Sequence, residues 1–128
     1  MICGVGVDIV AVERFRAVIE RKGDKFLRRV FAEAEIRYAR KCACPEERFA
    51  TRFAAKEAVL KALGTGWRRG VSFREIEVST NKAGAPAVSL SGRALEISRA
   101  LGVERLHVSL SHDSIYAVAQ VVAEGGHG

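Results

Sequence analysis

The segment over residues 45–64 carries the strongest helix signal in this chain of 128 residues and most constrains how the chain can fold. Pro45 suits a first helical turn, and Glu46 and Glu47 complement the positive end of a helix. Gly64 suits the end of the helix. An apolar stripe along the segment predicts a surface that faces the core: Phe49, Phe53, Leu60 and Leu63. The adjacent stripe holds two small and two charged residues, which leaves space for another backbone or a ligand: Ala50, Ala54, Glu57 and Lys61.

An apolar run over residues 2–7 predicts a buried strand, and Asp8 closes it with a carboxylate. Two glycines in the run allow another backbone to approach closely: Gly4 and Gly6. A strand that ends in a carboxylate, with a helix that carries Glu57 and Lys61, suggests a site for a divalent cation and a phosphate. Mg²⁺ is often held by one or two protein carboxylates, while substrate phosphates and water fill its other positions. The ordinary alternative is a strand-end cap plus a surface ion pair between Glu57 and Lys61.

The other periodic segments predict an α+β fold, in which helices pack on a small, mainly antiparallel sheet. Helical spacing is present in three further segments: residues 12–22, ended by Gly23, residues 25–41 as one or two short helices, and residues 92–101. Strands are expected in four segments, with a turn over residues 81–84: residues 73–79, 86–90, 106–110 and 117–122. No repeat or linker divides the chain, so we expect a single domain over residues 1–123 and a frayed tail over 124–128.

The positive charge of the chain is concentrated in one segment. The whole sequence has a formal net charge of +6, and residues 14–41 contain ten basic and four acidic side chains. Such an excess forms a steering patch and implies an acidic partner. It does not indicate nucleic-acid binding, because no helix-turn-helix or RNP-like strand is present. The nearby aromatic residues are expected in the helix core: Phe15, Phe26, Phe31 and Tyr38.

Neither a membrane span nor an export signal is apparent. No apolar run approaches the length of a span, and the N-terminus lacks a charged segment followed by an apolar one, so we expect a cytoplasmic protein without a membrane partner. The chain has three cysteines, and this odd number suggests no disulfide framework: Cys3, Cys42 and Cys44. Cys42 and Cys44 could be two metal ligands, but no second Cys or His cluster completes a zinc set. We therefore interpret them as incidental thiols.

Five short motifs occur in one order along nearly the whole chain: G-V-G-V-D-I-V at 4–10, R-F-A-A-K-E-A at 52–58 with Lys61, G-T-G at 64–66, I-E-V at 76–78 with Gly84 and Pro86, and H-V-S-L-S-H at 107–112. Alone, G-x-D or K-E-x-x-x-K is too common to indicate a family. Together, the motifs resemble the holo-[acyl-carrier-protein] synthase family, the small bacterial type of 4′-phosphopantetheinyl transferase.

The resemblance implies transfer of the 4′-phosphopantetheine group of coenzyme A (CoA) to a serine of an apo acyl carrier protein in fatty acid biosynthesis. The second product is adenosine 3′,5′-bisphosphate. It implies that Asp8 and Glu57 hold Mg²⁺ against the CoA diphosphate, and that Glu57, or a water it polarises, accepts the serine proton. Lys61 is then placed to neutralise or protonate the leaving phosphate. A transferase that acts on carrier domains of polyketide or peptide synthases is the alternative within the same family.

The resemblance also implies a homotrimer with active sites between subunits. Further contacts to CoA are implied at six positions: Arg52, Gly64, Thr65, Gly66, Pro86 and His112. Docking of the acidic carrier protein is implied at four positions of the basic segment: Arg14, Arg21, Phe26 and Arg29. His107 is interpreted as structural, and residues 33–47 follow no family pattern. A non-enzymatic adaptor is disfavoured, because an adaptor has no use for a magnesium site.

Overall fold

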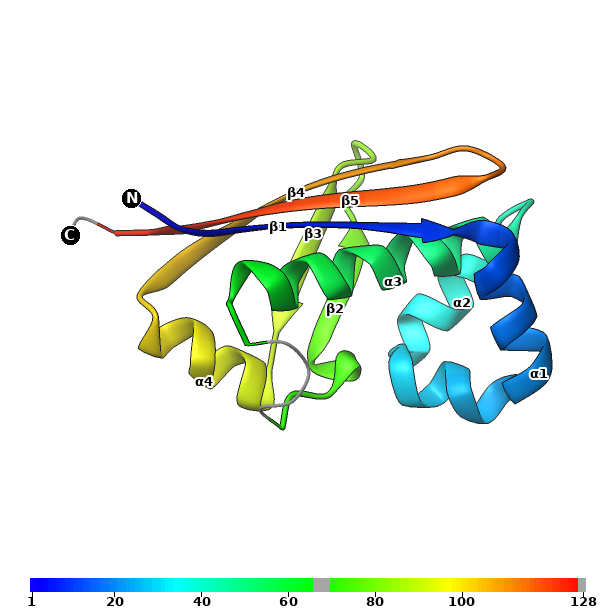
Figure 1. The fold of residues 1–128 in the computed structure, drawn as a ribbon, viewed down its shortest axis with the longest axis horizontal. Coiled ribbons are helices and arrows are strands. Elements are labelled where there is room, and N and C mark those ends of the chain that lie inside the picture. The colour runs from blue at the N-terminus through cyan, green and yellow to red at the C-terminus, as the bar shows by residue number, and fades with distance from the viewer. Residues whose placement is uncertain (66–69, 127–128) are drawn as a thin grey trace.

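The computed structural model describes residues 1–65 and 70–126, and Figure 1 shows the order of their elements. Four α-helices are present in these ranges: α1 (Val12–Val30), α2 (Glu33–Lys41), α3 (Pro45–Ala62) and α4 (Gly92–Ala100). Five strands accompany them there: β1 (Ile2–Ala11), β2 (Ile76–Thr80), β3 (Pro86–Leu90), β4 (Val103–His112) and β5 (Tyr116–Gly125). The predicted α+β class is confirmed. None of the described helices is long and apolar enough to cross a membrane.

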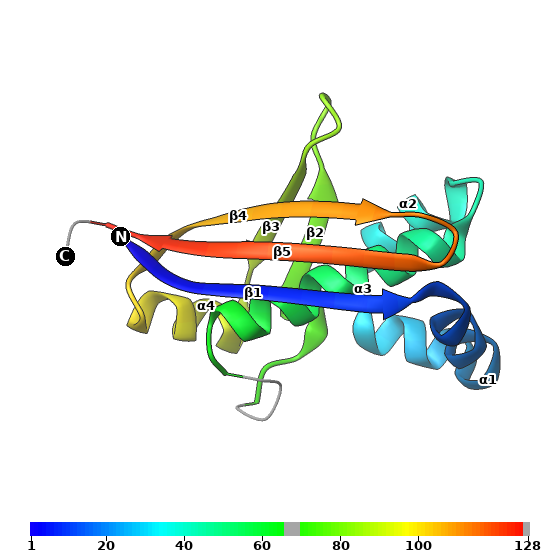
Figure 2. The ribbon, with the colours of Figure 1, turned by 45° about the horizontal axis from the view of Figure 1, so that its top comes forward.

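The three long strands form one antiparallel sheet in the order β1–β5–β4, and β2 pairs with β3 as a separate hairpin. Helix α3 runs along one face of the sheet, with α1 and α2 near one of its ends and α4 near the other (Figures 1 and 2). Since side chains alternate between the faces of a strand, the inner side chains of β5 are fully buried over α3: Ala117, Ala119, Val121 and Ala123. The predicted central helix is therefore confirmed as the core element of the fold.

Strand β1 lies directly on α3, because two glycines leave no side chains between the two backbones. A Cβ atom on Gly4 would lie 1.9 Å from the carbonyl oxygen of Ala62, and one on Gly6 would lie 1.9 Å from that of Ala58. Atoms cannot come so close, so only glycine permits this packing. The close backbone approach predicted from these glycines is confirmed.

Aromatic side chains form a second core that joins α1, α2 and α3. The ring centroids of Phe15 and Phe53 lie 4.9 Å apart, and those of Phe31 and Phe49 lie 5.1 Å apart. Helix α1 is kinked at Gly23, whose φ of 71° is a conformation that favours glycine. The break expected at Gly23 is therefore a kink within α1, and the helices expected over residues 25–41 are the second half of α1 and α2. The two halves of α1 contribute to the same core.

A buried ion pair ties α2 to α3 and β2. Nζ of the fully buried Lys56 lies 2.8 Å from Oε1 of Glu35 and also donates to the carbonyl oxygens of Phe73 and Ile76. The second Glu35 oxygen accepts the N–H of Val78 at 2.9 Å. Burial lowers the pKa of Lys56, and the charge of Glu35 opposes that effect. These bonds fix α2 against the rest of the molecule.

Strand β1 differs from its prediction in length and in exposure. We expected a buried strand that ends before Asp8, but β1 continues to Ala11 because its pairing with β5 extends that far. Asp8 therefore lies inside the strand and does not close it. The outer face of β1 is open, since Val5, Val7 and Ile9 are 55%, 56% and 61% exposed.

Other boundaries also differ from the predictions, and β4 is longer than expected at both ends. Residues 73–75 form a 3₁₀ turn, η2 (Phe73–Glu75), in place of the start of a strand, because the Ser72 hydroxyl accepts the N–H of Arg74 and caps the turn. Strand β5 continues to Gly125, whose N–H donates to the carbonyl oxygen of Met1. The strand thus extends two residues into the segment that was expected to be frayed.

Candidate active site

Asp8 and Lys61 meet where the inner face of β1 lies on α3. Lys61 Nζ lies 2.9 Å from Oδ1 of Asp8 and 3.0 Å from the carbonyl oxygen of Val7. Asp8 faces α3 because it is two positions from Gly6 along the strand. The side chain of Lys61 is 52% exposed and that of Asp8 is 17% exposed, so the pair lies at the edge of the core. In the described part of the chain, Lys61 thus pairs with β1 and not with Glu57 of its own helix.

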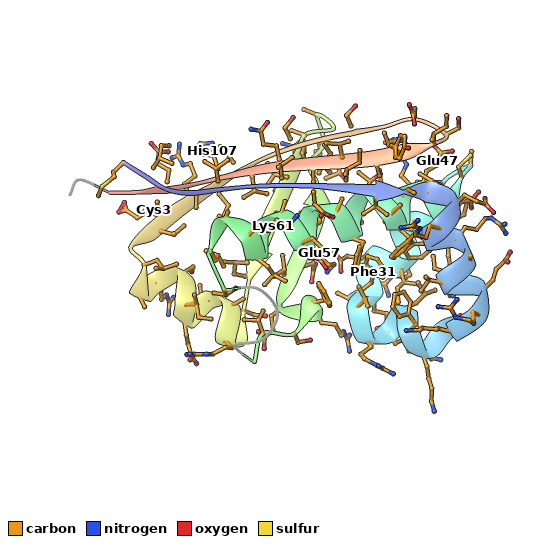
Figure 3. All side chains as sticks on the ribbon, viewed as in Figure 1. Cys3, Phe31, Glu47, Glu57, Lys61 and His107 are labelled. Carbon is orange, nitrogen blue, oxygen red and sulfur yellow. The ribbon has the colours of Figure 1, made fainter. Side chains whose placement is uncertain are left out.

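Glu57 lies one helical turn before Lys61 on α3 (Figure 3). Burial raises the pKa of its carboxyl, the negative charge of Asp8 raises it further, and Lys61 opposes both effects. The effect of Asp8 requires the two carboxylates to be near each other. The fold therefore brings Asp8, Glu57 and Lys61 together from two elements.

The two carboxylates suit a hard divalent cation with oxygen ligands. Within residues 1–65 and 70–126, no group of three or more His, Cys, Asp or Glu side chains is placed to hold a metal ion. Two carboxylates leave most positions of an octahedral ion to water or to substrate oxygens, which is how Mg²⁺ is often bound. A cation would also relieve the repulsion between Asp8 and Glu57. The residues present therefore fit Mg²⁺.

A cleft of about 490 Å³ opens beside these three residues. Its other walls come from β1, from Phe53 of α3 and from α1, which contributes Arg14 and Phe26. Two of the four positions predicted to dock the carrier protein thus border the cleft that holds the carboxylates. The other two, Arg21 and Arg29, are exposed on α1.

A second pocket of about 190 Å³ gathers Arg52, Pro86 and His112, three of the predicted CoA contacts. Arg52 is buried, donates to the Thr80 hydroxyl at 3.1 Å, and places its guanidinium 4.2 Å from the ring centroid of Tyr38. Burial lowers the pKa of Arg52. Its Nε has no hydrogen-bond partner among the described residues. The pocket therefore contains a desolvated cation with unused donor capacity.

His112 is held by two consecutive residues of α3 that the sequence did not mark as a site. Its Nε2 lies 3.2 Å from a guanidinium nitrogen of Arg48, and its Nδ1 lies 3.2 Å from Oε1 of Glu47. Arg48 precedes Arg52 by four residues, so both line the same pocket. That spacing is a signal by which Arg48 could have been found. Tyr38 carries no such signal, and it is 38% exposed where we expected it in the core.

The predicted G-T-G loop is only partly described. Gly64 and Thr65 follow α3 and line neither of these two pockets. The buried Thr65 hydroxyl has no hydrogen-bond partner within the described residues. Gly66 lies outside the described residues.

Comparison with known proteins identifies the family of this chain. A family model described as the 4′-phosphopantetheinyl transferase superfamily matches residues 4–119. The holo-[acyl-carrier-protein] synthase of Koribacter versatilis is 48% identical over 124 residues, which cover 97% of this chain and 99% of that protein. This chain belongs to the 4′-phosphopantetheinyl transferase superfamily.

Solved structures of this superfamily share the fold of the chain. Holo-[acyl-carrier-protein] synthase from Neisseria meningitidis superposes with a TM-score of 0.88 at 37% identity, over 97% of this chain and 99% of that chain. The Helicobacter pylori enzyme, solved in complex with coenzyme A, gives a TM-score of 0.82 at 33% identity, over 94% of this chain and 99% of its own. The family resemblance inferred from the five motifs is confirmed.

In this transferase fold, the predicted site residues fall into two groups. Asp8, Glu57 and Lys61 line the larger cleft, whereas Arg52, Pro86 and His112 line the smaller pocket. The described residues that line one do not line the other. Helix α3 contributes to both, with its first half at the pocket and its second half at the cleft.

Proposed function

We propose that this protein transfers the 4′-phosphopantetheine group of coenzyme A to a serine hydroxyl of an apo acyl carrier protein. The products are the holo-acyl carrier protein and adenosine 3′,5′-bisphosphate, and we assign the reaction to fatty acid biosynthesis. The observation that carries the proposal is the convergence of Asp8, Glu57 and Lys61 at a cleft bordered by a basic helix. Membership of the superfamily supports the same reaction.

Each of the three residues has a distinct part in this reaction. The serine oxygen forms a bond to the phosphorus that carries pantetheine, and the bond from that phosphorus to the bridging oxygen breaks. Glu57, a carboxylate whose pKa is raised by burial, accepts the serine proton directly or through a water that it orients. Lys61 neutralises the charge that develops on the leaving phosphate.

Asp8 and Glu57 are the residues that would hold Mg²⁺. When bound there, the ion supplies neutralisation of the charge on the diphosphate. Asp8 contributes a second negative charge. It does not act as a second proton acceptor, because its carboxylate is already bonded to Lys61 at 2.9 Å. The unequal surroundings of Asp8 and Glu57 support a division of work between them.

We propose further that the complete site forms between subunits of a homotrimer. Within one chain, the carboxylate cleft and the Arg52 pocket are two half-sites that share none of the described lining residues. The outer face of the sheet is turned away from the helices in Figure 2. On this face, Val5 and Ile9 of β1 lie opposite Val122 and Val118 of β5, and the exposed Val7 between them lies opposite Gln120. An open apolar face of this kind suits contact with further copies of the chain. Such contact would bring the pocket of one subunit to the cleft of the next.

The carrier protein is proposed to dock on α1. Acyl carrier proteins are acidic, and α1 presents three exposed arginines: Arg14, Arg21 and Arg29. Arg14 and Phe26 line the cleft together with the carboxylates. We place the reaction in the cytoplasm, where the three free thiols of this chain suit the reducing conditions.

Intact-protein mass spectrometry tests the proposed reaction. Incubation with CoA, Mg²⁺ and an apo acyl carrier protein should add the mass of one phosphopantetheine to the carrier. The shift should vanish when the acceptor serine is replaced by alanine. Apo carrier domains from polyketide and peptide synthases serve as competing substrates and show which carrier is preferred. The absence of a mass shift on every apo carrier would overturn the proposal.

A further inference from the structure

The imidazole of His112 is bonded on both sides by residues of the first turn of α3. Glu47 Oε1 lies 3.2 Å from Nδ1, and an Arg48 nitrogen lies 3.2 Å from Nε2. Both side chains of the His112–Glu47 pair are largely withdrawn from solvent, at 26% and 19% exposed. Figure 3 shows Glu47 at the end of α3 remote from Glu57 and Lys61. This chain of three residues is therefore not part of the carboxylate site.

Hydrogen-bond chemistry fixes the protonation of the ring in this arrangement. A guanidinium group has donors only, so Nε2 of His112 must accept from Arg48. A neutral imidazole has one donor and one acceptor, so Nδ1 carries the proton and donates to Glu47. The arrangement therefore selects one tautomer, and both partners favour it: Glu47 as the acceptor at Nδ1 and Arg48 as the donor at Nε2.

The orientation of the Arg48 side chain determines which of its donors face the pocket. Arg48 lines this pocket together with Arg52, whose Nε is without a hydrogen-bond partner in the described part of the chain. Two guanidinium groups that share one small pocket repel each other until an anion is bound. The other groups that face His112 are Tyr38 of α2, which lines the same pocket, and Asp113, next in the chain. Neither of them is bonded to the His112 ring among the described contacts, so Glu47 alone occupies its Nδ1.

We propose that Glu47 is a positioning residue for CoA binding. It holds His112 as the Nδ1–H tautomer, so that Nε2 accepts one N–H of Arg48 and the remaining Arg48 donors face the anionic part of CoA. Glu47 itself touches no substrate. The inference rests on the proposed function, because it takes CoA as the anion that enters this pocket.

The first test reads the tautomer directly. Long-range ¹H–¹⁵N correlation spectra distinguish Nδ1–H from Nε2–H imidazole and require no activity. Wild type should show His112 as Nδ1–H at a pH where the ring is neutral. Glu47→Gln keeps an acceptor oxygen and should retain this tautomer. Glu47→Leu leaves Nδ1–H without an acceptor, so it should raise the population of the Nε2–H tautomer, in which the ring no longer accepts from Arg48. An unchanged spectrum in Glu47→Leu would overturn the proposal.

The second test separates binding from chemistry. Glu47→Leu should raise KM for CoA by about tenfold, the effect of one lost charge-assisted hydrogen bond, with kcat and KM for the carrier protein nearly unchanged. Glu47→Gln should stay close to wild type. Glu46→Leu is the matched control, because Glu46 lies in the same helical turn and carries the same charge. If Glu46→Leu and Glu47→Leu raised KM for CoA equally, the effect would come from the interaction of a carboxylate with the helix dipole. That result would overturn the proposal.

Failure of the proposed function can be told apart from failure of this inference. Calorimetric titration with CoA measures the same weakening in Glu47→Leu when no carrier protein is present. Normal CoA binding, with the expected tautomer and no modification of any carrier, would contradict the transferase proposal and support this one. Unaltered CoA affinity in Glu47→Leu, with active wild type, would overturn this one alone.

Discussion

Lys61 Nζ on α3 lies 2.9 Å from Asp8 Oδ1 on β1, so the helix lysine is bonded across the fold to the strand carboxylate. This contact gives Asp8 a cationic partner before any substrate is present. The Lys61 side chain is 52% exposed and that of Asp8 is 17% exposed, so water reaches the pair from the lysine side and screens it in part. The pair is therefore weak enough for Lys61 to change partners when a phosphate enters the cleft.

Lys61→Ala should lower kcat more than it lowers CoA affinity, because the ammonium acts on charge that develops as the phosphate leaves. We expect a loss in kcat of about a hundredfold, comparable to the removal of one preorganised electrostatic contact. Steady-state kinetics and calorimetric CoA binding separate the two effects. An unchanged kcat with weaker CoA binding would instead make Lys61 a clamp for the ground-state phosphate.

Asp8→Asn should fold normally and lose turnover by about two orders of magnitude or more, because an amide cannot supply the negative charge that binds the cation. Wild-type activity should disappear on chelation and return with Mg²⁺. Asp24→Asn is a suitable control, since Asp24 is an exposed carboxylate that pairs with Arg40 away from the cleft. Near-wild-type, chelator-resistant turnover in Asp8→Asn would contradict the magnesium site.

The acid limb of the pH–rate profile should move to higher pH as the Mg²⁺ concentration is lowered. In the protein without a metal ion, burial first, and the charge of Asp8 second, raise the pKa of Glu57. A cation held by Asp8 and Glu57 opposes this shift, because it favours the carboxylate form. The proposed reaction needs Glu57 as a carboxylate, so activity should be lost as the pH falls through the Glu57 pKa. Profiles of kcat/KM for CoA in wild type at high and low Mg²⁺ give the measurement. Glu57→Asp, which moves the carboxyl toward the helix, should alter the limb, whereas Glu77→Gln should not.

The raised pKa of Glu57 also predicts a change in protein stability with pH. Stability should fall as the pH rises, whereas activity should increase. The folded state holds the Glu57 proton more tightly than the unfolded chain does, so the protein loses stability as the pH rises from the ordinary glutamate pKa to the raised one. Glu57→Gln removes this loss and should raise the unfolding midpoint at neutral pH without Mg²⁺, although turnover is abolished. A lower midpoint in this variant, measured by thermal or urea denaturation, would count against the desolvated carboxylate.

Val7→Glu should dissociate the proposed homotrimer, because it places a charge in the centre of the open apolar sheet face. Light scattering should then report a monomer, and turnover should fall even though Asp8, Glu57 and Lys61 are all present. Ser89→Glu introduces the same charge on the exposed surface of β3 and should leave both properties unchanged. An active monomer of Val7→Glu would show that one chain holds the complete site.

Arg21→Glu should raise KM for the carrier protein by about tenfold at low salt and leave KM for CoA nearly unchanged. The difference from wild type should shrink as the salt concentration increases, since exposed charges are screened. Arg99→Glu, an equal charge reversal on α4, is the control. Equal effects of Arg21→Glu on both substrates would place this arginine at the nucleotide and not at the docking surface.

Helix α3 and the glycine contact with β1 could be predicted because their signals are local. Each signal lies within a short stretch of the sequence. These signals are the apolar stripe of α3, its N-terminal proline, and the glycines at positions 4 and 6. Asp8 and Glu57 could be proposed as a pair because each is a charge in an otherwise apolar or small-residue setting. Their convergence depends only on β1 lying along α3.

The partners of the charged residues could not be predicted, because they depend on pairing between distant segments. Lys61 bonds a residue 53 positions away, and His112 bonds residues 65 and 64 positions away. The open face of β1 was missed for a different reason. An apolar strand has the same residues whether a helix of its own chain or another molecule covers it, so burial within the chain does not follow from the sequence.

Gly4 and Gly6 place the main chain of β1 against the main chain of α3, so backbone geometry sets the separation of the two carboxylates. A slip of β1 by one residue would turn Asp8 to the opposite face of the sheet, and it would press Val5 onto the carbonyl oxygens of α3. Tolerance to mutation should therefore be distributed unevenly in this molecule. The hydrophobic core can exchange one apolar side chain for another of similar volume, while two positions that lack a side chain keep the reaction centre in register.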